Sequence, residues 1–304
     1  MSSSLVESES SRSGALRVAD DLDADATAAA APGPASAVAE RRWTPRRIWS
    51  ASWPGLLAVA LVVIAWELVF VSGWKPDYVL PSPAEVGAQL VAFLSQPKFW
   101  QAILNTLLRA VIGFGLALVI GTVLGIAVSA SKVLRTAFGS MLTGLQTMPS
   151  IAWFPFAILL FGLTENAITF VVVLGAAPSI ANGLISGIDD VPPPLLRTAQ
   201  VLGAKGFTLY RWVILPSALP TYVAGLKQGW AFAWRSLMAG ELLVIIANKP
   251  SLGVQLQYYR EFANAPALIA TMIVVLVLGM VFDKLFSKLS EIVRVNRGLG
   301  ATLL

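Results

Sequence analysis

Long apolar runs separated by short polar segments dominate the sequence. Six runs are long enough to cross about 30 Å of hydrocarbon as helices, which takes about 20 residues each. A membrane offers no water to backbone groups, so segments of this kind must bond internally and form helices. None shows the two-residue alternation of an outer-membrane strand. The predicted spans are residues 54–71, 106–129, 138–161, 166–187, 220–247 and 266–286.

Composition points the same way. Of the 304 residues, 56% are hydrophobic and 13% are charged, and the mean hydropathy is +0.73. Soluble domains carry about 25% charged residues. The chain has no histidine and no cysteine, which excludes disulfides, metal sites built on those ligands, thiol catalysis and histidine-based triads. We therefore expect an all-α polytopic membrane protein whose bundle forms one domain, residues 49–298.

The two ends of the chain are polar. Residues 1–48 are rich in Ser, Ala and Asp and end in a basic cluster, so we expect a disordered tail; residues 299–304 form a short C-terminal tail. The cluster contains Arg41, Arg42, Arg46 and Arg47. It is interpreted as a topology signal, with a surface anchor on anionic membrane lipid as the alternative. With the N-terminus inside, 15 of the 22 Lys and Arg residues lie on the cytoplasmic side, which predicts that both termini are cytoplasmic. The net charge of +5 then reports topology and not binding of nucleic acid.

A short amphipathic helix is predicted before the second span. Ser82 can cap it, Pro83 suits its first position, and Glu85 completes a capping box. The apolar positions that follow share one face: Val86, Leu90, Phe93 and Leu94. We expect this helix at the outer surface, packed across the ends of the spans.

The loop of residues 188–219 is the longest predicted cytoplasmic connection. A proline-rich start is followed by Leu195, Ala199 and Leu202 at helical spacing. Gly203 and Gly206 follow, where a left-handed backbone is easily adopted. A second short helix is predicted over residues 207–215, stopped by Pro216. Two short helices with an apolar face suggest a docking surface.

One motif in this loop resembles a known family. Arg197-Thr198-Ala199, three residues, Gly203, nine residues and then Val213-Ile214-Leu215-Pro216 resembles the "EAA" loop of ATP-binding cassette (ABC) importer permeases. The departures are Arg197 in the place of the family's Glu and Thr198 in the place of an Ala. The positions to which the resemblance assigns coupling to the ATPase are Arg197, Thr198, Ala199, Leu202, Gly203, Ala204, Val213, Leu215 and Pro216.

Shorter strings are similar to the nitrate, sulfonate and taurine branch of that family. They are Leu80-Pro81-Ser82-Pro83, Trp234-Arg235-Ser236-Leu237 followed by Glu241, and Ser251-Leu252-Gly253. The resemblance implies a type I importer permease in the bacterial inner membrane that moves a small anion. It also implies two ABC ATPase subunits, an extracytoplasmic binding protein and a second permease copy as partners. The chain has no G-x-x-x-x-G-K-[ST] motif, so ATP and Mg²⁺ are expected on the ATPase. The chain itself is expected to bind no cofactor and no metal and to have no catalytic residues.

Charged residues within the spans indicate where a substrate could pass, because burying them in a membrane is costly. Arg235 is central in the fifth span and is proposed to attract an anion; the alternative is a structural pair with Glu241 or Glu67. Lys227 is expected to snorkel to the cytoplasmic face, and Arg109 to reach the interface. The candidate pathway residues are Arg235, Trp234, Trp153, Gln146 and Glu241, with Trp230 and Gln228 as weaker candidates.

Proline and glycine positions predict features of helix packing. Pro149, Pro155 and Pro178 should kink or unwind their helices. Pairs of glycines four residues apart allow close helix contact: Gly121 and Gly125, Gly183 and Gly187, and Gly225 and Gly229.

Other function classes explain less of the sequence. A secondary transporter or channel, the main alternative, often shows inverted repeats and leaves the loop motif unexplained. A membrane enzyme lacks paired carboxylates within a span and a G-x-S-x-G motif. A scaffold or insertion factor has no feature in its favour.

Overall fold

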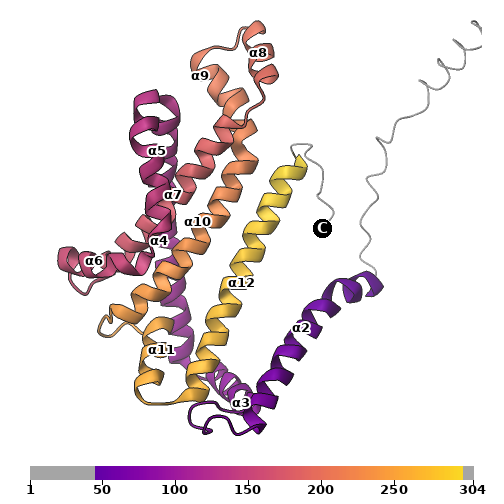
Figure 1. Cartoon of the computed structure of the whole chain (residues 1–304), viewed down its shortest axis with the longest axis vertical. Helices are drawn as coiled ribbons and strands as arrows, with labels where there is room; N and C mark the ends of the chain where they lie inside the picture. Colours follow the sequence, from indigo (N-terminus) through magenta and orange to yellow (C-terminus); the bar gives the residue numbers. More distant parts are fainter. Residues whose placement is uncertain (1–44, 297–304) are drawn as a thin grey trace, which may run out of the picture. The chain divides into compact units, whose positions relative to one another are not determined.

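The computed structural model describes the backbone of residues 45–296 and the side chains of residues 53–296. The regular secondary structure of this part is all helical, with no strand (Figure 1). The predicted N-terminal tail up to residue 44 and the residues from 297 onward lie outside the described residues. The long helices are α2 (Pro45–Val71), α4 (Pro97–Ala130), α7 (Glu165–Asp189), α10 (Leu215–Leu243) and α12 (Ala265–Asn296). The shorter elements are α3 (Pro83–Leu94), α5 (Lys132–Thr147), the 3₁₀ turn η1 (Ser150–Trp153), α6 (Phe154–Phe161), α8 (Pro193–Val201), α9 (Gly206–Leu209), the π turn η2 (Tyr210–Ile214) and α11 (Leu252–Glu261).

Four of the predicted spans are confirmed as single helices. The segment Trp53–Val71 of α2 and the helices α4, α7 and α12 are each long and apolar enough to cross a membrane. The chain forms two compact units, and the boundary between them lies after Leu61, within α2. The helix bundle is the second unit, and the structure describes it over residues 62–296. α4 begins before its predicted span and α12 continues beyond its own, to Asn296.

The third predicted span is broken. α5 ends at Thr147, and the chain bends by 103° before η1 and α6. Met148 and Pro149 have extended backbone, with ψ of 128° and 125°. Proline has no N–H to continue the helix and pushes the residue before it out of the helical region, which confirms the predicted interruption at Pro149. Pro155 does not interrupt a helix, because it lies in the first turn of α6, where proline is tolerated. α7 continues through Pro178 without unwinding, and a kink there stays a prediction.

The fifth predicted span corresponds to α10, which is less apolar than the others. Within the described residues, four helices qualify as spans by length and composition, or five when the bent pair counts as one. α10 is not among them, although its 29 residues are long enough at about 1.5 Å each. It carries Lys227, Arg235 and Glu241, which lower its hydropathy. The count of six spans therefore stays a prediction.

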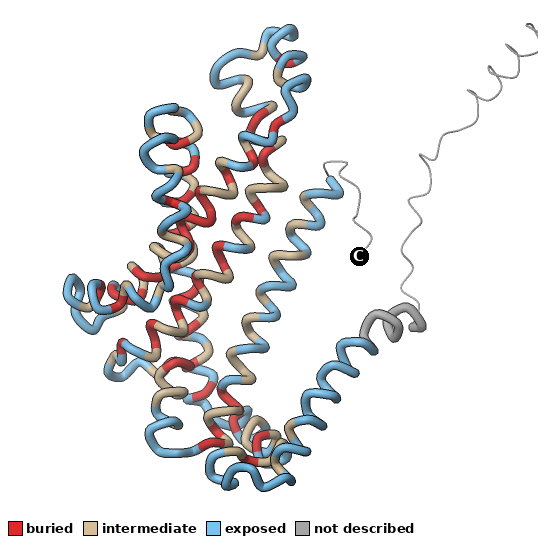
Figure 2. The backbone as a smooth tube through the Cα atoms, viewed as in Figure 1, coloured by how far each residue is buried: buried red, intermediate tan, exposed pale blue. Residues whose placement is uncertain are grey.

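The core of the bundle lies where α7 packs against both α4 and α10 (Figure 2). Small residues bring these helices close together: a Cβ atom added to Gly225 of α10 would lie 2.6 Å from Cα of Gly183 in α7. A Cβ added to Gly121 of α4 would lie 2.6 Å from the carbonyl oxygen of Ala177. The predicted close packing at the glycine pairs is confirmed, since side chains larger than hydrogen do not fit there.

The predicted helix before the second span is α3. Ser82 Oγ accepts a hydrogen bond from the Glu85 backbone N–H, and Glu85 Oε2 accepts one from the Ser82 N–H, each at 3.2 Å. Val86 and Phe93 are buried against residues of α4, α11 and α12. Leu94 is exposed, so the buried apolar face of α3 is narrower than predicted. This face packs across the bundle.

Candidate functional site

The loop of residues 188–219 contains the predicted first helix, α8, and ends it at the predicted glycine. Gly203 has φ of +88°, its N–H donates to the Gln200 carbonyl at 3.0 Å, and the Ala204 N–H donates to the Ala199 carbonyl at 2.9 Å. These two bonds form a Schellman motif, which ends a helix on a left-handed residue. Ala199 is buried and Ala204 half-buried.

The second half of the loop differs from the prediction. In place of one helix over residues 207–215, the chain forms α9, then the π turn η2, and continues directly into α10. Pro216 does not stop a helix but lies in the first turn of α10. Pro216 has no N–H and cannot donate an α-helical hydrogen bond to the preceding turn. The preceding turn is a wider π turn that does not require this bond, so the helical path continues into α10.

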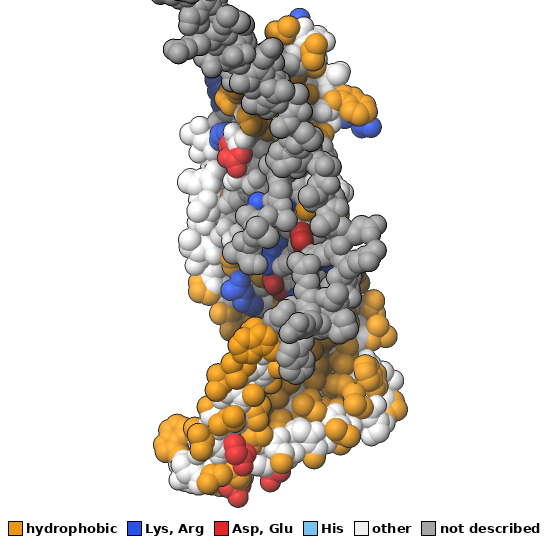
Figure 3. All heavy atoms as spheres, turned by 90° about the vertical axis from the view of Figure 1, so that its right-hand side faces the viewer, with side chains coloured by type: hydrophobic (Ala, Val, Ile, Leu, Met, Phe, Trp, Pro, Cys, Tyr) orange, Lys and Arg blue, Asp and Glu red, His pale blue; other side chains and the backbone are white. Residues whose placement is uncertain are grey.

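Large apolar side chains on this loop point into solvent. We call them the loop face, which consists of Leu195, Val201, Leu202, Phe207 and Trp212. Leu202 and Phe207 are 81% and 79% exposed. In Figure 3, hydrophobic side chains at the upper end of the molecule stand next to Lys and Arg side chains. Exposed apolar side chains gathered on one segment mark an interaction surface.

The remaining coupling candidates support this face or border it. Arg197 and Thr198 are exposed, and Thr198 Oγ1 donates to the Pro194 carbonyl at 3.0 Å. Val213 and Pro216 are half-buried and Leu215 is partly exposed. Arg197 forms no ion pair with another described residue, so the structure offers no account of its place in the motif.

Three of the five pathway candidates meet at one cavity. Gln146, Trp153 and Arg235 line a cavity of about 330 Å³ at the break between α5 and η1. Leu174 and Gly175 of α7 close its other side.

Trp234 lies elsewhere: it lines a second cavity, of about 610 Å³, between α10 and α12, where Trp230 and Arg235 also contribute. Gln228 is exposed and lines neither cavity.

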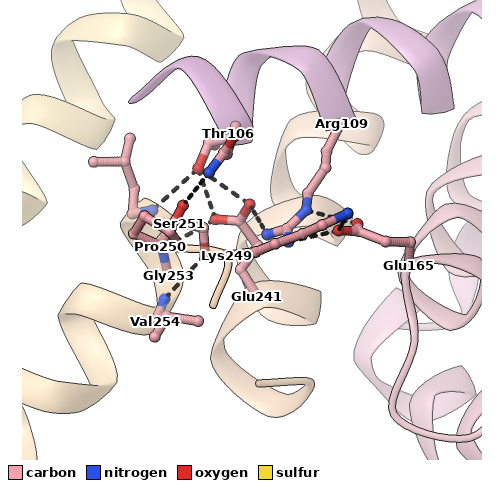
Figure 4. Close-up of polar contacts among 11 residues, drawn as sticks. Thr106, Arg109, Glu165, Glu241, Lys249, Pro250, Ser251, Gly253 and Val254 are labelled. Atoms are coloured by element: carbon pink, nitrogen blue, oxygen red, sulfur yellow. Dashed lines mark hydrogen bonds and ion pairs between the residues drawn. The ribbon is translucent and has the colours of Figure 1, made fainter. Parts of the chain in front are cut away.

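Glu241 lines neither of these cavities, and its predicted alternative pairing with Arg235 is wrong. Its carboxylate is fully buried and lies 2.9 Å from Nη1 of Arg109 (Figure 4). It also accepts hydrogen bonds from Thr106 Oγ1 at 2.9 Å and from the Gly253 N–H at 3.0 Å. A buried carboxylate needs such partners to offset its lost hydration, so Glu241 is a structural residue that joins α10 to α4 and α11.

Arg109 was predicted to reach the membrane interface, but in the structure it is held by two carboxylates. The Arg109 side chain is 9% exposed. Its guanidinium bridges two carboxylates, because it also binds Glu165 of α7 through bonds of 2.7 and 2.8 Å. Lys249 adds a third charge, 3.2 Å from Glu165. We call Thr106, Arg109, Glu165, Glu241 and Lys249 the clamp. The signal for it in the sequence is an arginine within a span, which requires a counter-charge.

Lys227 has two polar partners on α12. Its Nζ lies 3.2 Å from Asp283 Oδ1 and 2.8 Å from Ser287 Oγ, both on α12. The ammonium therefore bridges α10 and α12, and its extension to the cytoplasmic face stays a prediction.

Arg235, in contrast, has no carboxylate partner among the described residues. Its Nε donates to the Ala231 carbonyl at 3.0 Å, and its guanidinium lies 4.8 Å from the centre of the Phe232 ring. These contacts hold the stem and one face of the group and leave the two terminal nitrogens without a protein partner in the described part of the chain.

Several known proteins resemble this chain in sequence. The taurine transport system permease protein TauC of Escherichia coli is 27% identical over 75% of this chain and 83% of its own. An Escherichia coli permease protein assigned to aliphatic sulfonates, SsuC, is 30% identical over 76% of this chain and 86% of its own. The nitrate import permease protein NrtB of Synechocystis is 26% identical over 78% of this chain and 87% of its own.

Solved structures show the same fold. A subunit of the MetNI methionine ABC transporter in an inward-facing conformation matches 66% of this chain and 99% of its own, with a TM-score of 0.55 and 20% identity. A subunit of a bacterial transporter involved in the import of alginate matches 80% of this chain and 98% of its own, with a TM-score of 0.54 and 16% identity. In sequence, residues 113–293 match the protein family described as binding-protein-dependent transport system inner membrane component. The fold is therefore that of type I ABC importer permeases, and the chain belongs to the family of binding-protein-dependent transport system inner membrane components.

Proposed function

We propose that this permease moves a small anion into the cell by alternating access, driven by a separate ABC ATPase. Relatives named for taurine, aliphatic sulfonates and nitrate support this substrate class. An extracytoplasmic binding protein delivers the solute, and two permease copies enclose the path. Both termini face the cytoplasm of a bacterium. The secondary-transporter alternative has no support from the family to which the chain belongs.

The loop face is the observation that carries this proposal. Its side chains are exposed, whereas Ala199 and Ile214 beneath them are buried. The Schellman bonds at Gly203 fix the direction in which the chain leaves the end of α8. A rigid apolar projection of this kind suits a groove in a partner protein, and here we place one of two ATPase subunits. ATP and Mg²⁺ are bound by that subunit.

Transmission of force follows from continuity of the chain. η2 runs directly into α10, so movement of a docked loop would be passed to α10 without a hinge between them. Arg235 lies on this helix, beside Gln146 and Trp153 at the cavity. We therefore place the substrate pathway along that cavity, with Trp234 on the neighbouring side of α10.

The experiment is co-purification of the tagged permease with its ATPase. Leu202→Asp and Phe207→Asp each put a charge on the loop face, and we expect them to reduce the ATPase recovered by about tenfold, which is about 1.4 kcal/mol. Tyr258→Asp in α11 is the matched control, since Tyr258 is also exposed but belongs to another surface. Recovery of the ATPase at the wild-type level with both loop variants would refute the proposed docking.

A further inference from the structure

The cavity at the break between α5 and η1 has the chemistry of a selective site. We infer that it binds an organic monoanion with a short apolar tail and no cationic group, such as an alkanesulfonate. This inference rests on the proposed import of a small anion and narrows its substrate class.

A single charge sets the sign of the ligand. Among the described residues that line the cavity, Arg235 is the only charged one. The terminal nitrogens of its guanidinium have no carboxylate partner in the described chain, and the stem is fixed by the Ala231 carbonyl and the Phe232 ring. A guanidinium held in this way presents parallel N–H donors that suit two oxygens of one oxyanion.

A second donor faces the same cavity. Nε2 of Gln146 is buried and has no hydrogen-bond partner, and Gln146 lines the cavity with Arg235. A buried amide N–H without a partner is destabilising, and a ligand oxygen would supply that partner. The Arg235 guanidinium and Gln146 Nε2 are both donors to an anion, so an oxyanion satisfies them together.

The rest of the lining decides against two other kinds of anion. The walls are mostly apolar, with Leu145, Met148, Ile151, Trp153 and Leu174 among them, beside the hydroxyl groups of Thr147 and Ser150. An apolar tail gains by contact with these side chains, and nitrate has none. The described lining includes no carboxylate, so the ammonium group of taurine would enter the cavity without a counter-charge, which is costly.

The size of the cavity agrees with a small solute. Its volume of about 330 Å³ is at the lower end of the range of about 300–1,000 Å³ for ligand sites. A four-carbon sulfonate is small enough to enter with its head at Arg235 and its tail toward Trp153.

The test is calorimetric binding to the full-length permease–ATPase complex, without ATP and without the binding protein. The probes are 1-butanesulfonate, taurine and nitrate. We expect butanesulfonate to bind at least about tenfold more tightly than taurine or nitrate. Arg235→Gln should weaken butanesulfonate binding by about tenfold or more, and Arg235→Lys by less, because a charge remains. Lys288→Gln removes an exposed positive charge from α12 and serves as the control, with unchanged binding.

The outcomes separate this inference from the proposed function. Wild-type complex that fails to bind butanesulfonate, that binds taurine equally well, or that binds unchanged after Arg235→Gln would overturn the site, even if ATP-driven import is intact. Selective binding that depends on Arg235 in a complex that imports no solute would support the site and contradict the proposed function.

Discussion

Replacing Arg109 with Met tests whether the clamp stabilises the bundle. Glu241 is 0% exposed, and Arg109 is the cation 2.9 Å from it. Removing one partner of a buried ion pair leaves an uncompensated charge and costs about 3–5 kcal/mol. Thr106 and the Gly253 N–H would still bond the carboxylate, so we expect the lower end, a loss of about 3 kcal/mol in the free energy of unfolding.

Removing the other charge should be milder. In Glu241→Gln, an amide oxygen can still accept from the Gly253 N–H, and Arg109 keeps its two bonds to Glu165. We expect a loss of about 1 kcal/mol, typical of one hydrogen bond. The double variant Arg109→Met/Glu241→Gln buries no charge at this position. Its loss should therefore be smaller than the sum of the two single losses by about 1 kcal/mol or more.

The assay is reversible unfolding of the purified full-length protein in detergent, with the four proteins of the cycle compared. Arg260→Met is the control, because Arg260 of α11 is exposed and its loss should cost less than about 0.5 kcal/mol. The reasoning is refuted if Arg109→Met destabilises no more than Arg260→Met, or if the two clamp substitutions are additive.

Three further predictions follow from local geometry. Gly225→Ala places a Cβ 2.6 Å from Gly183 Cα and should lower the free energy of unfolding by about 1–3 kcal/mol, whereas Gly115→Ala, with open space around it, should not; equal effects in the unfolding assay would contradict this packing. Ser82→Ala removes the cap of α3 and should cost about 1 kcal/mol, and an unchanged unfolding midpoint would argue against the cap. Gly203→Val must adopt φ of +88°, which costs about 1–2 kcal/mol; the variant should reach the membrane but lose substrate-stimulated ATP hydrolysis, whereas Gly203→Asn should retain most of it. Normal hydrolysis with Val would show that the bend does not matter for coupling.

Local sequence signals predicted most of the fold. The capping box at Ser82, the helix end at Gly203 and the break at Pro149 each depend on neighbouring residues, and each is present in the structure. The hydropathy of four spans needed no tertiary information. The continuation through Pro216 could not be predicted, because the π turn before it has no distinct pattern in a single sequence.

The roles of charged residues could not be read in the same way. Arg109 and Glu241 are separated by 132 positions, and nothing in the sequence pairs them. Arg235 and Glu241 are both charged residues within one predicted span, so sequence reasoning assigns both to the pathway. Only the packing of α4 against α10 distinguishes them, because it buries Glu241 beside Arg109 and leaves Arg235 at a cavity.

The central claim, that the loop face docks on the ATPase, can be tested directly by cross-linking. The chain has no cysteine, so Leu202→Cys is the single thiol of the permease, and an ATPase subunit without cysteines completes the pair. Assembled with an ATPase subunit in native membranes and treated with a short thiol-to-amine cross-linker, this variant should form a permease–ATPase product, and Tyr258→Cys, equally treated, should form none. A cross-link from Tyr258→Cys, or none from Leu202→Cys in a complex that hydrolyses ATP and transports, would contradict the account.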